Sequence, residues 1–119
     1  MSDTETTHEH ILHGTDAGFM KDVIETSNDV PVLVDFWAPW CGPCKQLMPM
    51  LEKLVKAEGG NVKLVKINTE EHSGIAQQLR VRGIPMVFAF KDGKPVDAFT
   101  GALPQSKVQE FIDKQIGRT

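Results

Sequence analysis

The two cysteines of the chain, Cys41 and Cys44, stand three residues apart with Gly42 and Pro43 between them. They follow an apolar segment typical of a strand, and Pro43 suits the first turn of a helix, so the pair lies at a strand-to-helix junction. The two thiols are one helical turn apart, which lets their sulfur atoms face each other. At the helix N-terminus, unpaired N–H groups and the helix dipole favour an anion, so this position should favour the thiolate of Cys41.

This asymmetry predicts thiol–disulfide exchange. Cys41, as the thiolate, attacks a target disulfide and forms a mixed disulfide. Cys44 lies one turn deeper and should be shielded and less ionised. It then attacks Cys41 and releases the reduced target.

Three other interpretations of the cysteine pair are weaker. Half a zinc site needs two further ligands, and three of the four histidines lie in or beside a polar N-terminal segment while the fourth stands alone. A structural disulfide would close a tiny loop and remove little unfolded-state entropy. Two inert buried thiols fit poorly with a Gly-Pro turn between them. The histidines are His8, His10, His13 and His72.

Length and composition indicate one soluble domain. The chain has 119 residues, 40% of them hydrophobic and 24% charged, which is ordinary for a globular domain. The net charge is −3 and the 13 Lys and Arg residues are scattered, so neither nucleic acid nor a membrane is expected as a partner. Residues 1–10 are polar and acidic, so we expect a mobile tail without a signal peptide, followed by a single domain over residues 11–119.

After this tail the chain alternates between strand-like and helix-like patterns. The expected strands cover residues 11–12, 32–37, 62–67, 86–90 and 96–100. The expected helices start near residues 15, 43, 70 and 104. The first of these has its apolar residues on one side, namely Phe19, Met20, Val23 and Ile24. The order predicts an α/β fold whose mixed sheet has parallel core strands, a C-terminal antiparallel hairpin at Asp92-Gly93, and helices on both faces.

Two ionisable residues and two tryptophans are expected near the cysteines. Asp35 sits inside the apolar strand, where burial should raise the pKa of its carboxyl and make it an acid or base near neutral pH. Lys66 points by strand parity to a covered face, where it either pairs with Asp35 or packs its stem while its amine reaches water. Trp40 should be half exposed beside Cys41 as an apolar platform, and Trp37 should pack under the site.

These residues and their spacing resemble the thioredoxin family. The likeness runs from about Ile11 to Ile116, and its most specific part is Trp37–Lys45, which contains the Cys-Gly-Pro-Cys form. It also includes positions elsewhere in the chain: Asp35, Lys66, Ile84-Pro85, Asp92-Gly93 and Gly101. The resemblance implies a thioredoxin fold with about four helices around the sheet.

The resemblance also implies roles for single residues. Asp35 takes a proton from Cys44 through a water and pairs with Lys66, so the exchange chemistry belongs to Cys41, Cys44, Asp35 and Lys66. The Ile84–Pro85 bond is cis, and the Ile84 backbone faces Cys41, where an extended target can form backbone hydrogen bonds. The residues expected to bind the target are Trp40, Gly42, Pro43, Ile84, Pro85 and Gly101.

Two positions depart from the common family pattern. Met86 stands where many thioredoxins carry Thr, which puts target contacts in question while exchange should stay intact. Pro39 stands where some thioredoxins carry an acidic residue, and the lost negative charge should slightly favour the Cys41 thiolate.

The implied activity is that of a general dithiol reductant of protein disulfides, serving redox homeostasis in a reducing cytoplasm. The Gly-Pro dipeptide resembles reductants more than oxidases or isomerases. No bound cofactor is implied, because electrons would come from a thioredoxin reductase, a flavoprotein that carries FAD and is fed by NADPH. The expected partners are that reductase and disulfide-containing proteins, and the chain itself is expected to be a monomer.

Two alternatives stay open at this point. Residues 19–47 and 101–112 also resemble the N-terminal thioredoxin-like domain of bacterial co-chaperones that continue into tetratricopeptide repeats. The chain would then be a client-binding domain of a larger protein, with the cysteines guarding clients from oxidation. The other alternative is an oxidant in an extracytoplasmic space, which the Gly-Pro dipeptide and the absence of a signal peptide disfavour.

Overall fold

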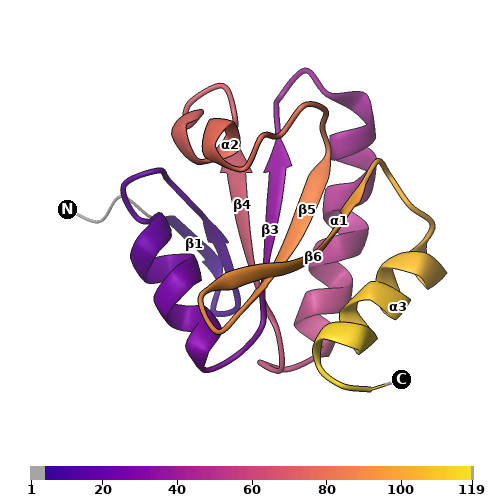
Figure 1. The fold of residues 1–119 in the computed structure, drawn as a ribbon. Coiled ribbons are helices and arrows are strands. Elements are labelled where there is room, and N and C mark those ends of the chain that lie inside the picture. Colours follow the sequence, from indigo (N-terminus) through magenta and orange to yellow (C-terminus); the bar gives the residue numbers. More distant parts are fainter. Residues whose placement is uncertain (1–4, 119) are drawn as a thin grey trace.

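Strand β3 (Val32–Trp37) runs through the middle of the computed structural model, which describes residues 5–118. Five of its six residues are apolar, and every residue except Trp37 is buried. It pairs in parallel with β4 and antiparallel with β5, within a mixed sheet of order β1-β2-β4-β3-β5-β6 (Figure 1). The other strands are β1 (Glu5–His8), β2 (Ile11–His13), β4 (Lys63–Asn68), β5 (Met86–Lys91) and β6 (Lys94–Thr100).

Alternate residues of β3 enter two different cores, as expected when both faces of a strand are covered. Leu33 belongs to a cluster with Leu47 of α1 and Ile112 of α3. Val34 and Phe36 belong to a second cluster on the other face. Figure 1 shows α1 and α3 on one side of the sheet, and η1 with α2 on the other. The helical segments are η1 (Met20–Glu25), η2 (Thr26–Asn28), α1 (Gly42–Ala57), α2 (Gly74–Gln78) and α3 (Gln105–Gln115). The predicted fold class is therefore confirmed.

The first helical segment differs from the amphipathic α-helix that its sequence predicts. It is a π-helix, η1, followed by a short 3₁₀ turn, η2. Phe19 and Val23 are buried as expected, but Met20 is 62% exposed. The i→i+5 bonding of a π-helix widens the turn. The spacing that would place Met20 on the buried side of an α-helix therefore does not do so here.

The N-terminal segment also differs from the expected tail over residues 1–10. Glu5–His8 form β1, an edge strand antiparallel to β2, with Thr6 opposite Leu12. Residues 1–4 lie outside the described part of the chain. An edge strand is joined through backbone hydrogen bonds and can carry polar side chains on its open side. The polar composition therefore did not exclude a strand.

The hairpin predicted at Asp92-Gly93 is present, and glycines also follow the end of α1. Asp92 and Gly93 both have positive φ (52° and 79°), which is the geometry of a two-residue hairpin turn between β5 and β6. Gly59 and Gly60, also at positive φ, follow the end of α1. The helix expected from residue 70 begins only at Gly74, after turns.

A side chain from the beginning of the chain caps α2. The carboxylate of Asp16 accepts the N–H groups of Gly74 and Ile75, each at 2.9 Å. These two groups belong to the first turn of the helix, where backbone donors have no partner within the helix. The segment before η1 is thus joined to α2.

Among residues 5–118, none of the helices has the length and apolar composition that a membrane span requires.

Candidate active site

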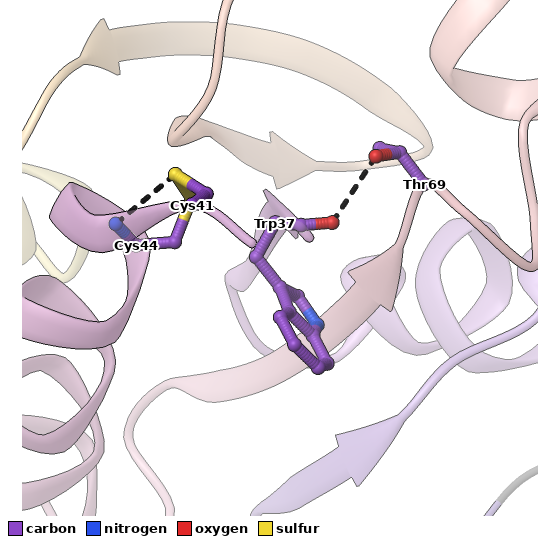
Figure 2. The surroundings of a disulfide bond; sticks show 4 residues. All are labelled: Trp37, Cys41, Cys44 and Thr69. Atoms are coloured by element: carbon purple, nitrogen blue, oxygen red, sulfur yellow. Dashed lines mark hydrogen bonds between the residues drawn. A yellow bond between two sulfur atoms is a disulfide. The ribbon is translucent and has the colours of Figure 1, made fainter. Parts of the chain in front are cut away.

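The cysteine pair lies where β3 gives way to α1. Cys41 is the N-cap of α1, in an extended conformation (φ −88°, ψ 106°), and its sulfur accepts the main-chain N–H of Cys44 at 3.2 Å (Figure 2). Pro43 lies in the first turn, where its missing N–H leaves no helical hydrogen bond unmade. The first turn contains no acidic residue. Negative charge on the Cys41 sulfur is therefore favoured by a direct donor and by the helix dipole.

Cys41 and Cys44 are joined in a disulfide, with their Cα atoms 5.3 Å apart, a usual spacing for such a bond. Cys41 is 4% exposed and Cys44 is 0% exposed. Ala38 completes this small cluster, and Trp37 and Ile84 pack against it. A reagent from outside therefore meets the sulfur pair at Cys41, in agreement with the expected shielding of Cys44.

Asp35 lies two residues before the end of β3, with 0% exposure. Neither of its carboxyl oxygens has a hydrogen-bond partner among the described residues. Burial raises the pKa of Asp35 to about 8; the nearby Lys66 charge lowers it and the Glu52 charge raises it further. As expected for an aspartate in an apolar strand, this carboxyl holds its proton at neutral pH.

Lys66 of β4 is buried beside Asp35, its register partner on β3, but it does not bind Asp35 directly. Its Nζ donates instead to Oε2 of Glu52 on α1, at 3.0 Å. The expected Asp35–Lys66 ion pair is thus corrected to a Lys66–Glu52 pair. The Glu52 side chain is 24% exposed, so its carboxylate loses less hydration on pairing than the carboxylate of Asp35 would.

Sequence reasoning did not single out Glu52. It occupies α1 beside Leu51, and nothing in its local pattern separates it from an ordinary solvent-facing glutamate. The one available signal was the covered position of Lys66, which requires a carboxylate from some neighbouring element.

The Ile84–Pro85 loop faces the cysteines from the other side of the junction. The Ile84–Pro85 peptide bond is cis, as the family resemblance implied, and Ile84 packs against the disulfide cluster. The Pro85 carbonyl accepts the N–H of Gly101 at 2.9 Å. Gly101 has φ +83°, a conformation that favours glycine. A Cβ added to Gly83 would meet nothing within 4 Å, so the surface there stays open.

A groove of about 410 Å³ runs beside the disulfide, lined among others by Trp40, Val81, Gly83 and Ile84. Trp40 is 67% exposed, so its indole is open to solvent as expected. Thr69, which also lines the groove, was missed by sequence reasoning. Its side chain donates to the Trp37 carbonyl at 3.2 Å, and Figure 2 shows the Trp37 indole extending away from the sulfur atoms.

A second cavity, of about 390 Å³, lies beside Trp37 and Lys66 and is also lined by His13 and His72. The structure thus brings His72 near another histidine, although the sequence placed it alone. Neither cysteine lines this cavity. Within residues 5–118, no group of three or more His, Cys, Asp or Glu side chains is arranged to hold a metal ion.

A cysteine pair at a helix N-terminus, opposite a cis-proline loop on a mixed sheet, defines a thiol–disulfide oxidoreductase. Comparison with known proteins makes the assignment specific, because the thioredoxin family model matches residues 10–114. The chain belongs to the thioredoxin family.

Three similar proteins illustrate the relationship. Thioredoxin 1 of Synechococcus elongatus is 44% identical over 102 residues, which is 86% of this chain and 94% of that protein. Thioredoxin of Haemophilus influenzae is 42% identical over 106 residues (89% and 97%). Thioredoxin of Pseudomonas aeruginosa is 43% identical over 108 residues (91% and 98%). Family and cysteine pair together identify a protein-disulfide reductase, and this function is favoured over a client-binding co-chaperone domain.

Proposed function

We propose that this protein transfers two electrons from its Cys41–Cys44 dithiol to disulfides of other proteins, as a general reductant in the cytoplasm. The observation that carries the proposal is the difference between the two sulfurs. Cys41 accepts a backbone N–H at the start of α1 and keeps an exposed edge, whereas Cys44 is fully buried. One sulfur is therefore suited to attack and the other to intramolecular resolution.

Two displacements make up the reaction. The Cys41 thiolate attacks one sulfur of the target disulfide; a Cys41–target bond forms, and the other target sulfur leaves as a thiolate that takes a proton from solvent. Cys44 then attacks the Cys41 sulfur, which forms the Cys41–Cys44 disulfide and releases the second target sulfur. The target gains two electrons and the dithiol loses two.

Asp35 serves the second displacement in this proposal. Cys44 must lose its proton to attack. Because Cys44 is fully buried, hydroxide from solvent is disfavoured there as the base. As a carboxylate, Asp35 would accept that proton through a water, and its pKa, raised to about 8 by burial, makes it a base matched to a thiol. The reverse reaction returns the proton from Asp35 to Cys44.

Target binding rests on the groove beside the disulfide. Ile84 packs against the cysteine cluster, and its main-chain groups enter none of the loop hydrogen bonds among the described residues. An extended target segment can pair with this backbone, while its side chains contact Trp40. Backbone pairing demands little of the target sequence, which suits a general reductant.

We assign regeneration to a thioredoxin reductase, a flavoprotein that would pass electrons from NADPH through FAD to the disulfide. Family membership supports this partner. In the regenerating step, a thiolate of the reductase attacks Cys41, because Cys41 is the sulfur with an exposed edge. Cys44 leaves first, and a second thiolate of the reductase then attacks the reductase sulfur bound to Cys41 and releases Cys41.

The test is an insulin reduction assay coupled to NADPH oxidation by a thioredoxin reductase. We expect rapid NADPH consumption that depends on both the reductase and insulin. The matched control is the Cys41→Ser/Cys44→Ser variant, which lacks the dithiol and whose fold is checked by circular dichroism. Turnover no faster than with this control would remove the proposed function.

A further inference from the structure

Three ionisable side chains meet on the α1 face of the sheet, two of them carboxyls and one an ammonium. Lys66 of β4 binds Glu52 of α1 at 3.0 Å. Asp35 of β3 is the register partner of Lys66 and is completely buried, yet both of its oxygens lack a hydrogen-bond partner among the described residues. The Lys66 ammonium thus pairs with the partly exposed Glu52 carboxylate and not with the fully buried Asp35 carboxyl.

The other elements packed around this group add one apolar neighbour and several titratable side chains. On β5 the register partner of Asp35 is Val87, which is apolar. On β2 the register partner of Lys66 is His13, which lines the same cavity as Lys66. Glu71 and His72, in the segment between β4 and α2, line this cavity as well. On α1, Lys56 follows Glu52 by one turn and is exposed. Within the described part of the chain, the only ion pair of Lys66 is the one with Glu52.

We propose that Glu52 is a positioning residue for disulfide exchange: by binding the Lys66 ammonium, it keeps that charge from pairing with Asp35 and so lets Asp35 hold a proton for Cys44. This inference rests on the proposed function. With Glu52 in place, the Lys66 charge is already neutralised, and ionised Asp35 would leave a net negative charge in a dry site. Without a charge at position 52, Lys66 would be free to turn to Asp35 and stabilise its carboxylate.

The consequence appears when the disulfide is opened. A reductase thiolate forms a bond to the Cys41 sulfur, the Cys41–Cys44 bond breaks, and its electron pair passes to Cys44. The proton on Asp35 moves to Cys44, leaving the Cys44 thiol and the Asp35 carboxylate. A second thiolate of the reductase then attacks the reductase sulfur bound to Cys41 and releases Cys41 as a thiolate. When Cys44 later attacks a mixed disulfide, the proton returns to Asp35. Glu52 touches neither sulfur and acts through Lys66 on the group that carries this proton.

The experiment follows the titration of the Asp35 carboxyl carbon by ¹³C NMR in the oxidised protein, with the signal assigned by its loss in Asp35→Asn. In Glu52→Gln we expect the midpoint to fall by about one pH unit or more, as for a carboxylate given a cationic neighbour. The matched control is Glu58→Gln, which removes the same charge from the end of α1, where Glu58 pairs with Arg118. Its midpoint should stay at that of the unaltered protein.

Two further variants separate positioning from a structural effect. Glu52→Asp keeps the charge and should move the midpoint much less than Glu52→Gln. Adding Lys66→Met to Glu52→Gln removes the ammonium, and the midpoint should rise again. An unmoved midpoint in folded Glu52→Gln, judged by circular dichroism, would overturn the inference, as would equal shifts in Glu52→Gln and Glu58→Gln.

A kinetic readout distinguishes this inference from the proposed function. The pH dependence of mixed-disulfide release should shift downward in Glu52→Gln together with the NMR midpoint. A moved titration with an unmoved release profile would overturn the link to exchange and, with it, the base role of Asp35. Absence of insulin reduction by the unaltered protein would instead defeat the proposed function, while the titration would still decide whether Glu52 controls Asp35.

Discussion

The main-chain N–H of Cys44 donates to the sulfur of Cys41 at 3.2 Å, so the residue that resolves the reaction also supports its nucleophile. In the reduced protein the same backbone donor would point at the Cys41 thiolate. A charge-assisted hydrogen bond of this kind is stronger than a neutral one. The two cysteines should therefore differ in reactivity as well as in exposure.

Alkylation measures that difference directly. Iodoacetamide added to the reduced protein at pH 6 should modify Cys41 well before Cys44, because only the thiolate reacts and only Cys41 keeps an exposed edge. Timed quenching followed by peptide mass spectrometry gives the two rates. The protein denatured in urea is the control and should lose most of the selectivity. Equal rates in the folded protein would contradict the assigned roles.

Serine substitutions separate the two displacements. Cys41→Ser should abolish insulin reduction, because no nucleophile remains at the helix N-terminus. Cys44→Ser should complete the first displacement only and accumulate a covalent complex with the target, visible on non-reducing gels and removed by dithiothreitol. If the trapped complex appeared with Cys41→Ser instead, the order of attack would be reversed.

Burial of Asp35 predicts how stability depends on pH. The pKa of Asp35 rises from 3.8 to about 8 on folding, mainly because of desolvation. Between these values the folded protein holds a proton that the unfolded chain has lost, so stability falls as pH rises from about 4 to about 8 and then levels off. The free energy of unfolding of Asp35→Asn lacks this pH dependence. Relative to the unaltered protein it should therefore increase over that range, by on the order of a few kcal/mol at pH 8.

Urea unfolding of the oxidised protein at a series of pH values measures this difference in the free energy of unfolding. Asp29→Asn, which changes an exposed carboxyl, is the control and should follow the unaltered protein. A difference between Asp35→Asn and the unaltered protein that stays constant with pH would show that Asp35 is ionised in the fold.

The features that the sequence could predict are those that depend on residues close together in the chain. The hairpin at Asp92-Gly93, the buried Asp35 and the cysteine pair follow from local patterns. The cis Ile84–Pro85 bond came from the family resemblance, since residue physics alone favours trans. Strand parity placed Lys66 on a covered face, but parity cannot say which of two carboxylates binds the ammonium.

Other features depend on contacts that no local pattern carries. Strand β1 exists through backbone pairing with β2, so its polar side chains gave no signal. Asp16 reaches across 58 residues of sequence to Gly74. Thr69 holds the Trp37 carbonyl from the loop after β4. In each case the partner becomes apparent only when the sheet order is known.

Glycine at position 14 is required by packing, which a stability measurement can test. A Cβ there would collide with the Val65 side chain. Gly14→Ala should lower the free energy of unfolding by about 1 to 3 kcal/mol, typical of overpacking. Gly83→Ala, where a Cβ meets nothing within 4 Å, should stay within about 0.5 kcal/mol of the unaltered protein. Equal losses in urea unfolding would contradict this account.

Trp40 provides a test of target binding that leaves the fold intact. Its side chain is 67% exposed, so Trp40→Ala should not change the unfolding transition. Loss of an aromatic contact in an interface should raise KM for insulin about fivefold or more, with kcat largely unchanged. Steady-state rates over a range of insulin concentrations provide both constants. A fall in kcat at constant KM would place Trp40 in the chemistry instead.

The two hydrogen bonds from Gly74 and Ile75 to Asp16 have a mechanical consequence. Because α2 leads directly into the chain that carries Val81 and Ile84, one wall of the groove is anchored to the opening segment of the domain. Swinging that wall outward to admit a bulky protein would break both bonds and uncap the helix. A target segment that is already extended would fit the groove without that loss.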